Sequence, residues 1–139
     1  MRILVAGSRS YNDYEEFRDI MNFVCKNYHD IEIVSWGARG ADNLAERYAR
    51  EKQYKLTIFK ADWNLYGNAA GYKRNIEMQD YIQQVDERLC ICFWDGQSKG
   101  TQHNFSAAKE RNTILIVYNF IKHRKEEIWY GYHEKNRWN

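Results

Sequence analysis

Apolar residues along the chain follow two different spacings, and these spacings predict an α/β fold. Short continuous apolar runs, typical of strands buried on both faces, indicate strands at residues 2–6, 31–35, 55–60, 89–93 and 113–118. Between the runs, apolar residues recur every three or four positions, as on the buried face of a helix. We therefore predict a Rossmann-like, doubly wound and mostly parallel sheet of five strands in a single domain.

The last part of the chain has a different composition. Residues 1–118 carry the predicted strands and helices, whereas residues 119–139 mix aromatic and basic side chains, among them Trp129, Tyr130 and Lys135. We expect this C-terminal extension to be helical in part at most. We expect it to pack on the domain or at a subunit interface, because an aromatic segment of this kind commonly does so.

Composition excludes several classes of partner and cofactor. The 139 residues carry a net charge of +2, too small to imply nucleic-acid or membrane binding by itself. No stretch approaches the roughly 20 apolar residues of a membrane span, and the N-terminal apolar run is too short for a signal peptide, so we expect a cytoplasmic protein. Cys25, Cys90 and Cys92 read as reduced core residues. The four histidines lack metal-ligand spacing, and no metal or cofactor is predicted.

Seven of the eight glycines follow predicted strands, where ligands bind in an open parallel sheet. The clearest case is residues 93–101, a strand that enters a glycine-rich turn and opens a helix. Gly96 and Gly100 would let the backbone turn sharply and let a ligand approach, and Thr101 would cap a helix whose free N–H groups attract phosphate. For any single glycine, turn geometry alone is an equally good explanation.

Charged and aromatic side chains share these loops. Arg9, Arg39, Arg74 and Lys99 would surround one crevice, although exposed cations can also serve solubility alone. Aromatic residues of the same loops could stack on a base or pack in the core. Since neither the P-loop nor the G-x-G-x-x-G spacing is present, these residues predict an anion or phosphate pocket and nothing narrower.

Five segments together resemble the YspA-like branch of the SLOG superfamily, which includes DprA/Smf proteins and LOG-type enzymes. They are residues 7–9, 37–42, 61–63, 69–75 and 94–101. The resemblance implies a Rossmann-like domain over residues 1–118 that binds a nucleotide-derived ligand, such as one related to ADP-ribose or NAD. The expected ligand-binding residues are Gly7, Ser8, Arg9, Gly37, Ala38, Arg39, Gly40, Asp42, Trp63, Arg74, Asn75, Trp94, Asp95, Gly96, Ser98, Lys99, Gly100 and Thr101.

The chain departs from LOG-type enzymes at one position. These enzymes carry a glutamate that acts on the ribose, and the corresponding residue here is Asn104. A side-chain amide cannot act as a general acid or base at neutral pH, so we expect binding without catalysis. A LOG-like nucleotide N-glycosidase or phosphoribohydrolase is the alternative, with a substitute acid–base group from Asp42, Asp62, Glu77 or Asp95.

Three hypotheses follow from the resemblance. The first is a binder that sequesters a signalling nucleotide, ADP-ribose-related or cyclic, as in antagonism between phage and host. The second is the nucleotide-cleaving enzyme. The third is DprA-like binding of single-stranded nucleic acid through the basic and aromatic tail, which we favour less than packing of that tail. LOG-type relatives commonly pair their subunits, so we also expect a homo-oligomer.

Overall fold

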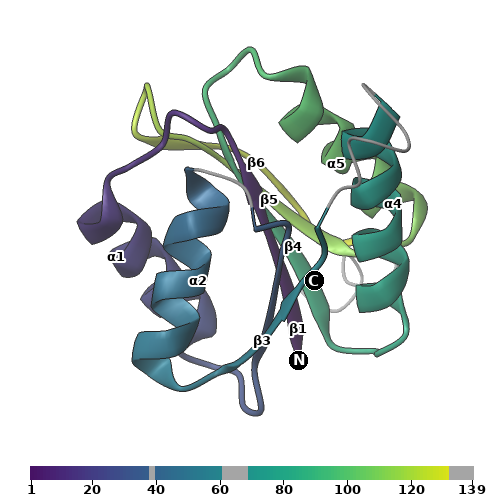
Figure 1. Ribbon diagram of the computed structural model, residues 1–139, viewed down its shortest axis with the longest axis horizontal. Coiled ribbons are helices and arrows are strands. Elements are labelled where there is room, and N and C mark those ends of the chain that lie inside the picture. The colour runs from purple at the N-terminus through teal and green to yellow at the C-terminus, as the bar shows by residue number, and fades with distance from the viewer. Residues whose placement is uncertain (38–39, 61–68, 132–139) are drawn as a thin grey trace.

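A computed structural model of the chain describes residues 1–37, 40–60 and 69–131 (Figure 1). Strands and helices alternate from the N-terminus, as the sequence predicts, and a last strand follows without a helix before it. The elements are β1 (Arg2–Gly7), α1 (Tyr14–Cys25), β2 (Glu32–Ser35), α2 (Ala41–Lys52), β3 (Lys55–Ile58), α4 (Ala70–Gln83), β4 (Arg88–Trp94), α5 (Lys99–Glu110), β5 (Ile114–Asn119) and β6 (Arg124–Trp129).

The strands form one sheet in the order β3-β2-β1-β4-β5-β6. The first five are parallel, and β6 runs antiparallel to β5. Helices α1 and α2 cover one face and α4 and α5 the other, so the sheet is doubly wound (Figure 1). The order reverses between the neighbours β1 and β4. This arrangement confirms the Rossmann-like α/β class, and the loops after β1 and β4 meet at the reversal.

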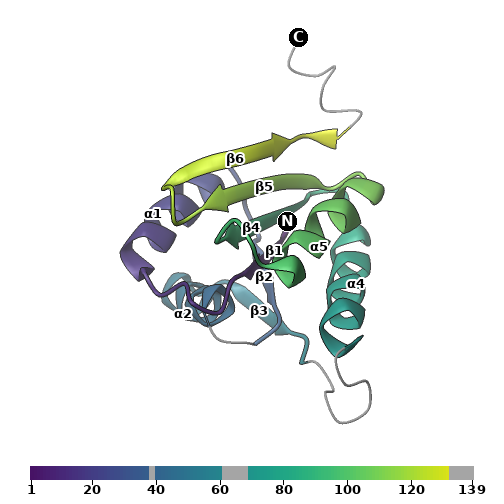
Figure 2. The same ribbon diagram turned by 90° about the horizontal axis from the view of Figure 1, so that it is seen from above.

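The sheet has six strands, so the predicted count of five is wrong. Residues 124–129, expected to be helical in part at most, form an edge strand instead (Figure 2). Ile128 pairs with Ile116 and Trp129 with Leu115, which places one apolar pair on each face of the sheet. The first four residues of β6 are charged and give no period-two pattern, and tertiary pairing with β5 decides their conformation.

Two apolar clusters, one on each face of the sheet, make up the core. Phe17 of α1 and Tyr48 of α2 pack with Phe93 on one face, and Ile82 of α4 packs with Leu4 on the other. The three cysteines are free and buried, which confirms that they are reduced core residues. Within the described ranges, no helix combines the length and apolar character needed to cross a membrane.

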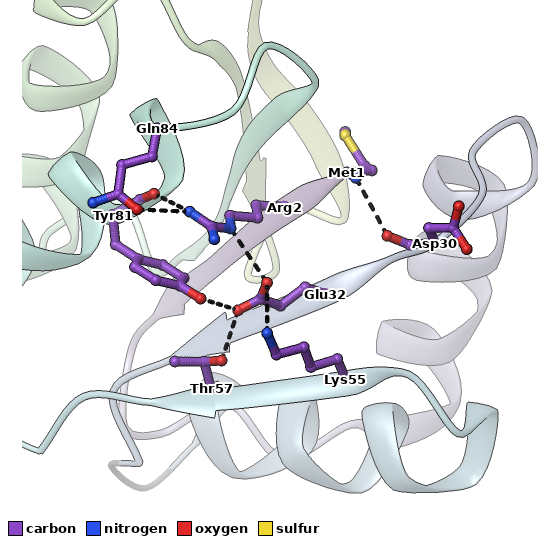
Figure 3. A network of polar contacts seen from close by, with 8 residues as sticks. All are labelled: Met1, Arg2, Asp30, Glu32, Lys55, Thr57, Tyr81 and Gln84. Atoms are coloured by element: carbon purple, nitrogen blue, oxygen red, sulfur yellow. Dashed lines mark hydrogen bonds and ion pairs between the residues drawn. The ribbon is translucent and has the colours of Figure 1, made fainter.

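A polar network around Glu32 ties α4 to the sheet at the end where the parallel strands begin (Figure 3). Thr57 Oγ1 and Tyr81 Oη each donate to Glu32 Oε2 at 2.6 Å, and Arg2 Nε donates to Glu32 Oε1 at 3.2 Å. Burial opposes ionisation of this carboxyl, but these hydrogen bonds and the charges of Arg2 and Lys55 lower the pKa of Glu32 below its usual value. The network attaches the C-terminal end of α4 to the first residues of β1 and β2.

Candidate functional site

A cleft of about 490 Å³ opens where the chain order of the strands reverses, at the carboxyl ends of β1 and β4. Its walls come from the loop after β1, the residue after β2, the first turns of α4 and the turn between β4 and α5. This size suits a small-molecule ligand. The lining residues are Gly7, Ser8, Arg9, Ser10, Trp36, Gly71, Tyr72, Asn75, Asp95, Ser98, Gly100 and Thr101.

The turn between β4 and α5 is organised by Asp95. Its Oδ1 accepts hydrogen bonds from the backbone amides of Gln97 at 2.8 Å and Ser98 at 2.7 Å, and Gly96 supplies the positive φ of +87°. Ser98 then caps α5, because its Oγ accepts from the Thr101 amide at 3.5 Å. The prediction that Thr101 caps the helix is therefore wrong. The Asp95 turn ends the loop early enough for the helix to begin at Lys99.

Gly100 has a different role from the one predicted for a turn glycine. It lies in the first turn of α5 and not in the preceding turn, and it is not among the glycines with positive φ. A Cβ built at Gly100 would have no heavy atom within 4 Å. Its Cα side therefore faces open space at the cleft, and a ligand can approach the first turn of α5 closely.

Asp95 and Arg9 give the cleft both signs of charge. Burial opposes ionisation of Asp95, but hydrogen bonds from the Ser98 and Gln97 amides outweigh it and lower the pKa of this carboxyl. Asp95 is thus ionised at neutral pH. Lys99, predicted to line the pocket, is exposed and does not line the cleft.

The wall after β1 contains a buried hydroxyl. Ser8 is only 4% exposed, and its amide donates to Phe93 O at 3.0 Å. Its Oγ makes no hydrogen bond of normal geometry with the described residues, but it lies close enough to Asp95 to help lower the pKa of that carboxyl. An unsatisfied buried hydroxyl is costly, and a ligand or an ordered water commonly satisfies such a group. Gly40 packs directly against this loop, since a Cβ at Gly40 would overlap Ser8 O.

Asn75 links the two helices that border the cleft. Its Nδ2 donates to Gly100 O at 3.1 Å and lies 3.3 Å from His103 Nδ1. The Tyr72 ring meets the His103 ring edge-on, with the ring centres 4.8 Å apart. Burial lowers the pKa of His103, which is therefore neutral at pH 7. The α4 wall consequently offers an amide and an aromatic ring rather than a cation.

The substitute carboxylates do not converge on the cleft. Asp42 is buried in the first turn of α2, where Ser35 Oγ donates to its Oδ1 at 3.4 Å, and burial raises the pKa of this carboxyl to about 7. Neither Asp42 nor Glu77 lines the cleft, and Glu77 is paired with Arg74 at 2.6 Å. Asp95 is the carboxylate that does, and Asp62 lies outside the described residues.

Asn104 lies in the interface between α4 and α5. It is buried, and its Oδ1 accepts from Gln79 Nε2 at 3.0 Å. It is not among the residues that line the cleft. The Asn104 side chain therefore links α5 to α4 through Gln79. An acid–base side chain at position 104 would have to give up this hydrogen bond to reach a ligand in the cleft.

The predicted ligand-binding residues fall into three groups. Eight line the cleft, namely Gly7, Ser8, Arg9, Asn75, Asp95, Ser98, Gly100 and Thr101. Seven lie elsewhere, namely Gly37, Gly40, Asp42, Arg74, Trp94, Gly96 and Lys99. Ala38, Arg39 and Trp63 lie outside the described residues.

Several residues away from the cleft wall shape the loops that form it. Trp94 Nε1 donates to Ser98 O at 3.1 Å and thereby holds the turn that Asp95 begins. Gly37 has a φ of +81° and packs on Ile58. A Cβ at Gly7 would overlap Ala41 Cβ, so this lining glycine also lets α2 pack closely on β1.

Four lining residues were missing from the predicted set: Ser10, Trp36, Gly71 and Tyr72. Trp36 directly follows the predicted strand at residues 31–35, so its position alone could have indicated it. In the parts of the chain that the structure describes, no cluster of three histidine, cysteine, aspartate or glutamate side chains could hold a metal ion.

Comparison with known proteins gives two matches. Residues 1–66 match the family described as "YspA, cpYpsA-related SLOG family". The chain is also similar to "Gene 61 protein" of Mycobacterium phage D29, with 33% identity over 121 residues that cover 83% of this chain and 94% of that protein. The second match thus extends well beyond the first three strands.

Proposed function

The chain belongs to the YspA, cpYpsA-related SLOG family, and from this premise we propose that its cleft binds a nucleotide-derived small molecule and holds it intact. One observation carries the proposal. The first turn of α5, Arg9 and Ser8, whose buried hydroxyl makes no hydrogen bond of normal geometry with the described residues, all border the same cleft.

The anionic part of the ligand belongs at α5. The first N–H groups of a helix have no partner within the helix, and their dipole favours negative charge. Ser98 satisfies the Thr101 amide, and the amide of Gly100, a residue that lines the cleft, is the one that a ligand there can reach. Arg9 would add a charge-assisted hydrogen bond to a phosphate, and Ser8 Oγ a neutral one.

The remaining part of the ligand must offer hydrogen-bond donors to a carboxylate and a flat surface to aromatic rings. Ionised Asp95 repels a second phosphate but accepts hydrogen bonds from a hydroxyl or amino group, as ribose and bases offer. Trp36 and Tyr72 provide aromatic surface at the same cleft. A phosphate linked to ribose and a base, as in ADP-ribose-related molecules, combines these features.

A protein that binds a nucleotide without cleaving it can still act by sequestering it. Asp95 is ionised and so cannot act as the acid that protonates a leaving group at neutral pH. The related protein of Mycobacterium phage D29 places one relative in a phage, where withdrawal of a host signalling nucleotide would be useful. We propose the same role for this chain.

Isothermal titration with ADP-ribose, NAD, cyclic ADP-ribose isomers and cyclic oligonucleotides tests binding directly. We expect at least one of them to bind. Arg9→Ala should weaken it about 10- to 100-fold, as expected for loss of a charged hydrogen bond. Lys99→Ala is the matched control, because Lys99 is a nearby cation that does not line the cleft. No binding by any of these ligands would refute the proposal.

Cleavage of the ligand is the second candidate, and the position of Asp95 in the cleft is the observation that favours it. Chromatography of each bound ligand after incubation and denaturation separates the two functions. Recovery of intact ligand supports sequestration. Release of a base or ribose phosphate, lost in Asp95→Asn, would support the enzyme instead.

A further inference from the structure

A second groove, of about 620 Å³, lies on the α1 side of β5 and β6 and shares no residue with the cleft. Because β5 returns directly into β6, the described chain has no helix between these strands to cover that side. The apolar residues that line the groove include Phe23, Ile114, Ile116, Ile128 and Tyr130, and these five are here called the open face. Phe23 is 59% exposed, Ile128 39% and Tyr130 43%.

An exposed apolar surface of this kind is unusual on a monomeric protein. Isolated exposed apolar residues are common, but a contiguous patch around a groove indicates an interaction site. The residues come from α1, β5 and β6 with the residue that follows it, so the patch joins α1 to a hairpin about 90 residues further along the chain. Figure 2 shows β6 at the outer edge of the sheet, where a partner can reach it.

The open face carries charges of both signs, and Lys125 lies far along the strands from Asp86 and Glu87. The ammonium groups of Lys26 and Lys125 lie 4.4 and 5.0 Å from the centre of the Phe23 ring. Asp86, Glu87 and Arg88 line the same groove where β4 begins, and the Arg88 guanidinium donates to Thr113 Oγ1 and to the backbone carbonyls of Val85 and Arg111. The strand registers separate Lys125 from Glu87 by about six residues, or roughly 20 Å along the strands. Within the described ranges, the two lysines, Asp86 and Glu87 form no ion pair.

We propose that the open face is the interface of a symmetric homodimer. A twofold axis through its apolar centre would bring Lys125 of one copy to Asp86 and Glu87 of the other, twice over. The same mixture of charges argues against an anionic lipid surface, which Asp86 and Glu87 would repel. The contact uses the face and not the edge of β6, because the bulge opposite Val117 and Tyr118 and the charges at 124–125 oppose strand pairing at that edge.

Sedimentation equilibrium of the full chain over about a hundredfold range of concentration tests this interface. We expect a monomer–dimer equilibrium for the wild type. Ile128→Glu and Phe23→Glu should each weaken association by more than about tenfold. The first places a charge in the apolar centre, and the second puts a carboxylate beside Lys125, where it competes with Asp86 and Glu87 of the other copy. Ile121→Glu is the control: Ile121 is also exposed, at 63%, but lies outside the groove.

A charge-reversal pair makes the test specific for the predicted twofold contact. Lys125→Glu and Glu87→Lys should each weaken the dimer, and the double variant should recover much of the loss. Circular dichroism checks that every variant is folded, and Phe23→Glu is the least disruptive because Phe23 already faces solvent. A wild type that stays monomeric throughout, or a dimer indifferent to both glutamate substitutions, would overturn the proposal. The result is independent of ligand binding, since the two sites share no residue.

Discussion

The N-termini of α2 and α5 both follow a buried strand and a turn with positive-φ glycine, but they meet different surroundings. At α2, Gly40 packs against the loop after β1, Ala41 packs against Gly7 at the end of β1, and Asp42 is buried within the first turn. At α5, Ser98 caps a first turn without any acidic residue, and a Cβ at Gly100 would meet nothing within 4 Å. A helix N-terminus can bind a ligand only where no other segment packs against it. Here the first turn of α5 lines the cleft at the carboxyl ends of β1 and β4, whereas that of α2 is covered.

Gly40→Ala should give the largest effect, because it forces a side chain into the closed contact. The backbone at Gly40 has a φ of +74°, and its Cβ would lie 2.7 Å from Arg9 Cα besides overlapping Ser8 O. Strain and overlap together should lower the free energy of unfolding by about 3 to 5 kcal/mol. Urea unfolding followed by circular dichroism measures this loss. A loss below about 1 kcal/mol would mean that the contact between α2 and the loop after β1 is not tight.

Asp42→Asn should change how stability depends on pH. The pKa of Asp42 is raised from 3.8 to about 7, so the folded chain keeps this proton through a window in which the unfolded chain releases it. Stability conferred through Asp42 therefore falls as pH rises from about 4 to about 7, by up to about 4 kcal/mol. The asparagine removes this dependence.

Urea unfolding of both proteins at several pH values isolates the Asp42 contribution, because other titrating groups cancel in the difference. The variant should be similar to wild type near pH 4 and more stable by about 2 to 4 kcal/mol near pH 8. A difference that stays constant over this range would show that Asp42 ionises normally in the folded chain.

Ser98→Ala tests which residue caps α5. Loss of the side-chain acceptor for the Thr101 amide should reduce stability by about 1 kcal/mol. Thr101→Val is the matched control, because it removes the other hydroxyl of the same first turn and leaves the cap in place. Thermal unfolding of the two variants distinguishes them. If Thr101→Val proved the more destabilising, the cap would be Thr101 after all.

Gly100→Ala should have the smallest effect on folding and the opposite sign to Gly40→Ala. Alanine is preferred to glycine in a helix, and the space around Gly100 is open, so stability should rise by about 0.5 kcal/mol. The new methyl group would stand where a ligand approaches α5, so affinity for the ligand should fall. Chemical unfolding and titration of the same sample check both directions.

The chain's periodicity was sufficient to predict the first five strands and their intervening helices, because each forms a continuous pattern of its own. β6 was not predicted, because its first four residues are charged and show no strand pattern of their own. It forms a strand because it pairs with β5, which its own sequence does not reveal. The candidate site was predicted only in part, because it too depends on contacts between segments that are distant in sequence. Which turns stay open depends on β1 lying beside β4, and sequence spacing around Gly40 or Gly100 carries no information on that neighbour.

The most direct test of the account follows the backbone amides of the two helix N-termini by two-dimensional NMR during titration with ADP-ribose and NAD. If the ligand sits at α5, the amides of Ser8, Gly100 and Thr101 should shift and saturate together, while those of Ala41 and Asp42 stay in place. Shifts at α2 without shifts at α5, or no change at either helix with any ligand, would contradict it.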